Sequence, residues 1–291
     1  MPPLRHIRKR IASVKNTQQI TKAMKMVAAA KLRVAEEKLK ASRPYSNKLD
    51  ELIIDLYERT ELEGYPLLHG KEEIKTVELV VVTSDRGLCG AFNSNILRHA
   101  IGTIRYFQEQ GKNVQLSVIG RKCLDFFKRR PFSIRKTYIN FLRDVSYELA
   151  LEVGNELVDA FSNNITDEVY LIYNEFISAI RQKIVTRKLI PAQLPEHPQP
   201  TGLEAKVDYR YEPNREQIFK FLLPKEVNFQ LYRAFIESFT AEMGARMSSM
   251  DSASNNASEM IATLTLQYNR ARQNAITTEL MDIINGAEAQ K

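Results

Sequence analysis

Apolar residues recur at alternating intervals of four and three over the last quarter of the chain. Ten positions with this spacing hold nine apolar side chains and one serine. The spacing is the heptad repeat of a coiled coil. Because several positions hold Ala or Ser, we expect a partner helix to approach closely. The ten positions are Met243, Met247, Met250, Ser254, Ala257, Ile261, Leu264, Tyr268, Ala271 and Ala275.

The N-terminal segment carries a similar but less regular repeat. Polar Gln18, Thr21 and Lys25 occupy heptad positions in its middle, so we expect apolar neighbours to replace them in the seam. These neighbours are Ile20, Met24 and Val27. The apolar heptad positions on either side are Ile7, Ile11, Val14, Ala28, Leu32, Ala35, Leu39, Leu49, Ile53 and Leu56.

Glycine and proline are scarce in both segments. Neither occurs in residues 4–43, and Gly244 alone interrupts residues 225–285. Because these residue types normally end helices, the pattern predicts two long helices, over about 4–56 and 212–285. A helix of about 55 residues is roughly 80 Å long. That length favours an antiparallel coiled coil of the two terminal helices over packing in an ordinary helix bundle.

The middle of the chain alternates predicted strands with predicted helices. Residues 77–83 form a β-branched apolar run that is typical of a buried strand. Alternation of this kind predicts an open α/β sheet of the Rossmann-like class. Further strands are expected at 114–119, 133–140, 168–176 and 184–194. Helices are expected from Asn93 or Ser94 to Gln110, after Gly120 to Phe127, and from Asp144 to Phe161. Pro191, Pro195, Pro198 and Pro200 predict a stiff linker.

These patterns divide the chain into three parts. We expect an N-terminal coiled-coil helix in residues 1–60, an α/β domain in 75–200 and a C-terminal coiled-coil helix in 212–287. The charge is unevenly spread over them. Residues 1–43 hold twelve Lys and Arg against two Glu, whereas the other residues hold 30 basic and 33 acidic side chains. A basic segment of this kind is expected to bind an acidic surface. The alternative is that the charged side chains only face solvent.

The strongest candidate for chemistry is the loop that follows the first strand, Thr83–Gly90. Ligands bind at such places in open α/β sheets, but the loop matches neither phosphate-binding glycine motif. A phosphate site and a structural or partner-binding turn both stay open, and the turn is favoured. The four histidines are isolated in sequence, so no metal-ligand spacing occurs. We predict no catalytic residue, no nucleotide or metal site and no cofactor.

Several other classes are disfavoured. No apolar run is long enough to span a bilayer, and the N-terminus lacks the apolar core of a secretory signal. Two cysteines, Cys89 and Cys123, make no disulfide framework, which suggests a reducing compartment. Nucleic-acid binding is disfavoured because no aromatic residue is interleaved with the basic residues before Tyr45.

Four separated segments, in the same order, resemble the gamma subunit of bacterial F-type ATP synthase. Arg10–Leu32 resembles the start of its N-terminal helix, and Thr83–Asn93 resembles its middle motif. Glu237–Met247 is similar to the start of its C-terminal helix, and Ile276–Ala289 to its C-terminal signature. The resemblance covers the whole chain.

The resemblance implies the central rotor shaft of a proton-transporting ATP synthase. Its terminal helices would form the coiled coil, and rotation of the shaft would couple proton flow to ATP synthesis on the beta subunits. It implies one copy per complex, on the cytoplasmic face of the bacterial inner membrane. The implied partners are the alpha and beta subunits, the epsilon subunit and the membrane c-ring. An α/β enzyme with helical assembly arms is the alternative.

The resemblance, together with the charge and the helix ends, also suggests where rotor and stator interact. The polar C-terminal residues should face the surrounding ring, because an antiparallel partner that begins near Leu4 cannot cover the whole C-terminal helix. The candidate interface residues are Lys9, Met24, Lys25, Arg246, Gln273, Thr277 and Glu279.

Overall fold

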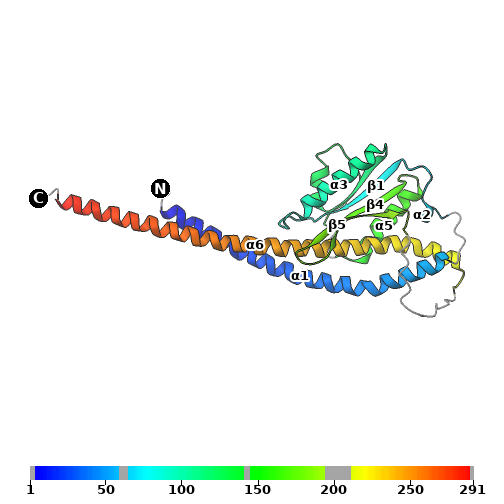
Figure 1. Cartoon of the computed structure of the whole chain (residues 1–291), viewed down its shortest axis with the longest axis horizontal. Helices are drawn as coiled ribbons and strands as arrows, with labels where there is room; N and C mark the ends of the chain where they lie inside the picture. Colours follow the sequence, from blue (N-terminus) through cyan, green and yellow to red (C-terminus); the bar gives the residue numbers. More distant parts are fainter. Residues whose placement is uncertain (1–3, 59–64, 141–144, 194–210, 289–291) are drawn as a thin grey trace. The chain divides into compact units, whose positions relative to one another are not determined.

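The computed structural model describes residues 4–58, 65–140, 145–193 and 211–288. The chain divides into two compact units. The coiled-coil unit consists of Met1–Ala30 with Arg246–Lys291, and the α/β unit of Lys31–Ala245. Two long helices, α1 (Leu4–Glu58) and α6 (Arg215–Glu288), contribute to both units (Figure 1). The two predicted terminal helices are thus confirmed, with bounds that differ by no more than three residues.

Each long helix contains one proline, Pro44 in α1 and Pro224 in α6, and continues beyond it. Proline removes one main-chain hydrogen bond and usually disfavours a helix interior. Here apolar side chains of both helices pack together in the α/β unit close to the prolines, and their burial offsets that loss. The buried residues are Leu49, Ile53 and Leu56 of α1 with Phe219, Leu223 and Phe229 of α6.

A five-stranded sheet lies at the centre of the α/β unit (Figure 1). Its strands are β1 (Thr76–Val82), β2 (Asn113–Ile119), β3 (Ser133–Tyr138), β4 (Glu168–Phe176) and β5 (Gln182–Ile190). They follow the order β3-β2-β1-β4-β5. All neighbours are parallel except β4 and β5, which form an antiparallel hairpin at one edge. The predicted open α/β sheet is confirmed.

Helices cover both faces of the sheet. α3 (Phe92–Glu109) and α4 (Arg121–Phe127) pack on one face, and α5 (Tyr147–Ser162) packs with α6 on the other. Successive residues of a strand point to opposite faces. Accordingly Val81 of β1 belongs to the core under α3 and α4, and Val82 to the core under α5 and α6. A short helix, α2 (Pro66–His69), has no counterpart in the prediction.

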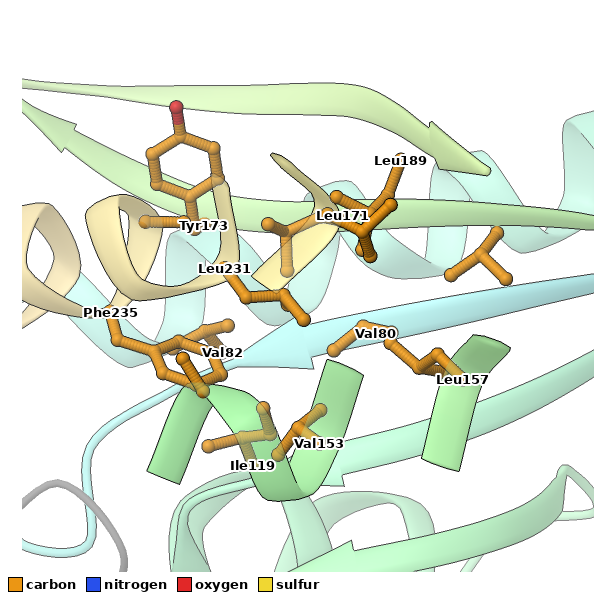
Figure 2. Packing of buried hydrophobic residues seen from close by; sticks show 14 of the residues in the cluster. Val80, Val82, Ile119, Val153, Leu157, Leu171, Tyr173, Leu189, Leu231 and Phe235 are labelled. Carbon is orange, nitrogen blue, oxygen red and sulfur yellow. The ribbon is translucent and has the colours of Figure 1, made fainter. Parts of the chain in front are cut away.

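Figure 2 shows how the second of these cores is built. Side chains from β1, α5 and α6 converge between the sheet and the two helices, and all are buried. They include Val80 and Val82 from β1, Val153 and Leu157 from α5, and Leu231 and Phe235 from α6. Fully burying one such side chain contributes about 1.5–3 kcal/mol. This part of α6 is therefore integral to the core of the α/β unit.

The predicted N-cap of α3 is wrong. The cap position is Ala91, so neither Asn93 nor Ser94 occupies it. The Asn93 side chain bonds backward instead, because its Oδ1 accepts a hydrogen bond from the main-chain N–H of Ser84 at 3.1 Å. A contact to the preceding loop thus replaces the expected cap.

Two further boundaries differ from the prediction. α5 begins at Tyr147 with Ser146 at its N-cap, while the expected cap, Asp144, lies outside the described residues. β5 ends at Ile190, earlier than expected, because Pro191 has no N–H to continue the ladder. The linker prolines after Pro191 also lie outside the described residues.

A buried carboxylate, Glu226 of α6, weakens the α/β unit at neutral pH. Its exposed fraction is 4%. Its Oε1 accepts a hydrogen bond from Gln230, but its Oε2 has no hydrogen-bond partner. Burial raises the pKa of Glu226, the nearby Asp50 raises it further, and Gln230, Arg187 and Arg233 only partly oppose this. Folding therefore favours the protonated form.

We expect Glu226→Gln to stabilise the α/β unit at pH 7.5 and not at pH 4. The native state binds more protons than the unfolded state between the unfolded pKa of about 4.3 and the raised native pKa. Stability is therefore lost as pH rises through this window, and glutamine removes the loss. The gain should be about 0.5–2 kcal/mol. Urea unfolding followed by tyrosine fluorescence measures it, since eleven of the twelve tyrosines lie in Lys31–Ala245.

Glu216→Gln is the matched control on the same helix. Glu216 is exposed, and its hydrogen bond from Lys220 lowers its pKa. Its charge stabilises the native state above the unfolded pKa, so the control should shift stability in the opposite direction at pH 7.5. If Glu226→Gln unfolds at no higher urea concentration than the wild type at pH 7.5, the burial penalty is absent.

Candidate functional site

Two side-chain contacts define how α1 and α6 pair in the coiled-coil unit. Gln18 Nε2 donates a hydrogen bond to Ser258 Oγ, and Lys25 forms an ion pair with Asp251. Lys25 lies seven residues after Gln18, and Asp251 lies seven residues before Ser258. The two helices therefore run antiparallel, and one heptad of α1 matches one heptad of α6.

The heptad of α6 is confirmed by burial. Nine of its ten predicted positions are buried or half-buried, and Ala275 is the exposed one. The predicted drift of the α1 seam is wrong. Thr21 is buried at 8% exposure, whereas Ile20 and Val27 are 60% and 59% exposed. Gln18 and Lys25 find partners across the seam, and Thr21 Oγ1 donates to the Gln18 main-chain oxygen within α1, so the heptad continues without a shift. Ile20 and Val27 point away from α6 instead.

The C-terminal part of α6 extends beyond its partner. Continuing the register from Gln18 and Ser258 places Leu4, the first described residue of α1, opposite Arg272. Every residue from Arg272 to Ala287 is exposed. This agrees with the expectation that α1 cannot cover the whole C-terminal helix. We call Arg272–Ala287 the single-helix stretch.

The single-helix stretch carries exposed apolar side chains that sequence reasoning missed. Their spacing places them on one side of the helix, and they are 45–67% exposed. They are Ile276, Leu280, Met281, Ile283 and Ile284. Contiguous exposed apolar residues mark interaction surfaces. The sequence contained a sign of this surface. These apolar residues do not occupy heptad positions, and the change occurs where α6 extends beyond the start of α1.

The seven candidate interface residues all belong to the coiled-coil unit. Lys9 is exposed, and Met24 and Arg246 are half-buried. Lys25 forms an ion pair with Asp251. Gln273, Thr277 and Glu279 are exposed in the single-helix stretch. Two of these are joined, because Thr277 Oγ1 donates a hydrogen bond to the Gln273 main-chain oxygen at 2.9 Å.

The loop after β1 is held by its own side chains. Ser84 Oγ donates to the main-chain oxygen of Arg86 at 2.6 Å, and Asn93 Nδ2 donates to Ser84 Oγ at 2.7 Å and to Cys89 Sγ at 3.2 Å. Cys89 is buried with Phe92 against two alanines of α6, Ala241 and Ala245. The polar side chains of this loop are therefore already hydrogen-bonded, and the loop packs on α6. Both observations favour a structural turn over a phosphate site.

The neighbouring turn also leaves no room for a ligand. Gly120 has φ 94°, and a Cβ there would lie 2.2 Å from the main-chain oxygen of Thr83. Asp85 accepts hydrogen bonds from the main-chain N–H groups of Arg121 and Asn140, both at 2.9 Å. The carboxylate thus joins three loops at the C-terminal edge of the sheet.

Within the part of the chain that the structure describes, no three His, Cys, Asp or Glu side chains are grouped to hold a metal ion. In the same residues no helix is long and apolar enough to cross a membrane. The buried thiol of Cys123 has its pKa raised by burial. Such a thiol is a poor nucleophile at neutral pH.

Comparison with known proteins identifies the family. The model of the ATP synthase family (ATP-synt) matches residues 3–290. An ATP synthase gamma chain from an Anaeromyxobacter species is 47% identical over the full length of both chains, and that from Geobacter metallireducens is 48% identical, also over both full lengths. The chain belongs to the ATP synthase gamma-chain family. It is therefore a subunit of an ATP-synthesising complex.

Solved structures agree with this fold. The chain is similar to a chain of the Euglena gracilis mitochondrial ATP synthase rotor, with TM-score 0.61 and 20% identity over 94% of this chain and 98% of that one. It is also similar to a chain in the central stalk and c-ring structure of the Tetrahymena thermophila mitochondrial ATP synthase, with TM-score 0.60 and 23% identity over 81% and 99% of the two chains. At these identities the likeness establishes the fold.

Proposed function

We propose that this gamma chain is the central rotor shaft of a proton-transporting F-type ATP synthase. It couples proton flow through the membrane sector to ATP synthesis on the beta subunits by rotating. The full-length family match carries this proposal. The single-helix stretch supports it, because a shaft that turns inside a ring needs a surface that its own partner helix leaves uncovered.

The partners follow from the same assignment. The alpha and beta subunits surround the coiled coil, the epsilon subunit and the c-ring lie near the α/β domain, and one copy serves each complex. The chain is then a peripheral protein on the cytoplasmic face of a bacterial inner membrane. The three-part division into 1–60, 75–200 and 212–287 assigns the two outer parts to the shaft.

In this role the chain has no catalytic site of its own. The alternative, an α/β enzyme with helical assembly arms, requires a free catalytic group at the sheet. The two obvious candidates among the described residues, Ser84 and Cys89, are engaged inside the loop that packs on α6. ATP chemistry then belongs to the beta subunits, and this chain transmits torque.

Single-molecule rotation tests the proposal. The chain is assembled with alpha and beta subunits, the ring is fixed to a surface, and a bead is attached through Gln108→Cys on the exposed side of α3. Within this chain the label attaches at residue 108, because Cys89 and Cys123 are buried. Addition of ATP should turn the bead in one direction. A bead that stays still while the complex hydrolyses ATP contradicts the proposed function.

The rotor–stator interface is assigned to exposed and half-buried residues of the coiled-coil unit. Each exposed charge pair across such an interface contributes roughly 0–1 kcal/mol, so several must act together. Weak contacts of this kind can break and reform as the shaft turns. The assigned residues are Lys9, Met24, Lys25, Arg246, Gln273, Thr277 and Glu279.

We expect Lys9→Gln combined with Lys25→Gln to lower ATP-driven proton pumping more than either change alone. Both remove positive charge from a helix that should face acidic loops of the beta subunits, and such charges act collectively. Proton pumping in membrane vesicles measures the effect. Unchanged pumping by the double variant rules out this role for the basic end.

Asp251→Asn provides a matched control. It breaks the ion pair within the coiled coil but keeps the charge of Lys25. Because the two side chains are 40% and 47% exposed, the pair contributes little to stability. Asp251→Asn should therefore pump like the wild type. If it matches Lys25→Gln instead, Lys25 acts by holding α1 to α6.

A further inference from the structure

A groove of about 980 Å³ lies between α3 and α4 in the α/β unit. Apolar side chains, Leu97 and Ile101 from α3 and Phe126 from α4, contribute to its lining. Four cationic side chains and one carboxylate line it as well. The charged residues are Arg98, Lys122, Arg129, Arg130 and Asp125. The groove therefore combines an apolar surface with an excess of positive charge.

Three of the four cations of this groove have no polar partner among the described residues. No ion pair or side-chain hydrogen bond joins Arg98, Lys122 or Arg129 to another of the described residues. Elsewhere on the same unit, lysines and arginines pair with carboxylates at close range. Examples are Lys71–Asp167, Lys112–Glu168, Lys188–Glu168, Arg135–Glu78 and Arg233–Glu237. The groove thus gathers, within one surface, three cations that have no ion pair among the described residues.

Part of the groove is already ordered. The Arg130 guanidinium carbon lies 3.6 Å from the centroid of the Phe126 ring, and its Nη1 donates to the Phe126 main-chain oxygen. Arginine stacked on an aromatic ring is held in place and keeps donors available. A ligand that binds there has less side-chain motion to restrict.

We propose that this groove binds an acidic, amphipathic segment of another protein subunit of the complex. The inference rests on the proposed function, because it takes the partner from the assembled ATP synthase. The carboxylates of the segment would pair with the cations, and its apolar side chains would cover the half-buried Ile101 and Phe126. Complementary charge of this kind sets orientation and selects the partner.

The arrangement fits a polypeptide better than a phosphate compound. Lys122 lies in the first turn of α4, whereas Arg129 follows the last helical residue, Phe127, and a seven-residue helix is roughly 10 Å long. A phosphate group needs donors that converge on one point, whereas these cations are spread along the groove. The apolar lining also needs apolar side chains to cover it, and a phosphate group supplies none.

Photo-crosslinking in the assembled complex tests the proposal. Ser94 is exposed and lines the groove, so Ser94→p-benzoylphenylalanine places a crosslinker there. After irradiation, mass spectrometry should find one protein segment in which Asp and Glu alternate with apolar residues. Arg98→Glu with Lys122→Glu should lower the crosslink yield at least about tenfold, because like charges repel.

The matched control is Arg181→Glu with Lys183→Glu. It makes the same charge change at exposed residues of the β4–β5 hairpin, and the yield should not change. If the groove reversal prevents assembly, Arg98→Gln with Lys122→Gln replaces it, and a weaker loss is expected.

Three outcomes overturn the proposal. They are a crosslink to lipid alone, a crosslink to a neutral or basic segment, and a yield that charge reversal leaves unchanged. Absence of any crosslink in a complex that hydrolyses ATP and pumps protons also overturns it, and leaves the proposed function intact. Failure of the bead to rotate contradicts the proposed function instead.

Discussion

Replacing Glu78 by alanine should lower the free energy of unfolding of the α/β unit by about 3 kcal/mol. Glu78 lies in β1 and is fully buried. Its carboxylate accepts hydrogen bonds from Arg135 Nη2 at 2.8 Å and from Ser117 Oγ at 2.5 Å. Arg135, 12% exposed, also contacts Glu156 of α5 at 2.7 Å. Three adjacent strands and one helix thus meet in one network.

The size of the effect follows from what the substitution leaves behind. Breaking a buried pair costs about 3–5 kcal/mol, because the remaining charge stays buried without its partner. The lower end applies here, since Arg135 keeps Glu156. Urea unfolding followed by tyrosine fluorescence reports on this unit.

Two comparisons separate the buried pair from a general effect of removing a carboxylate. Glu73→Ala removes an exposed carboxylate that pairs with Lys75, and it should change stability by less than about 0.5 kcal/mol. Replacing Glu78, Ser117 and Arg135 together by apolar residues should recover at least half of the loss. A loss below about 1 kcal/mol for Glu78→Ala shows that the network does not stabilise the fold.

The coiled coil was predictable because its signal is local. A heptad repeats within each helix, so burial of Met250, Ala257 and Leu264 follows from the spacing alone. The polar seam was not predictable in the same way. Gln18 and Lys25 look like interruptions until their partners, more than 220 residues away, are known. Only the folded chain shows that these residues extend the seam.

In the α/β unit, too, local patterns were predictable and long-range contacts were not. Strand positions followed from β-branched runs, but Glu78 within the first run gave no sign of its partner Arg135. The helix cap at Ala91 was missed because Asn93 and Ser94, the two residues expected to cap the helix, lie inside it and bond backward to Ser84 and Ala91. Non-local polar pairs decide these details, and a single sequence does not reveal which residues pair.

For the candidate interface, sequence and structure each supply one part. Helix lengths alone predicted that Gln273, Thr277 and Glu279 lie beyond α1, and the antiparallel register agrees with this. In the proposed rotor these residues face surfaces of other subunits. Their role is therefore tested best through a property of the whole complex.

We expect Glu279→Lys and Met24→Lys to leave the chain folded but to lower the coupling between ATP hydrolysis and proton pumping. Glu279 is exposed on the single-helix stretch, and Met24 is half-buried near the seam. A new lysine at either position loses little or no core packing, since a long side chain can lie along the helix with its amine in water. It does change the attraction between shaft and ring.

The added charge should act through the uneven surface that a turning shaft meets. A cation that pairs with an acidic residue in one orientation lowers the energy of that orientation by about 0.4–1 kcal/mol. The shaft then stays there roughly two to five times longer. Some ATP is then hydrolysed without the corresponding rotation of the shaft. The ratio of protons pumped to ATP hydrolysed should therefore drop.

Membrane vesicles that contain the reconstituted complex allow both rates to be measured together. Glu109→Lys makes the same charge change as Glu279→Lys at an exposed residue of α3; it serves as the control and should keep the wild-type ratio. Circular dichroism of each variant establishes that the helices are intact. If Glu279→Lys and Met24→Lys both keep the wild-type pumping-to-hydrolysis ratio, the coupling contacts lie elsewhere, and the exposed apolar residues Ile276, Leu280 and Ile283 are the next to test.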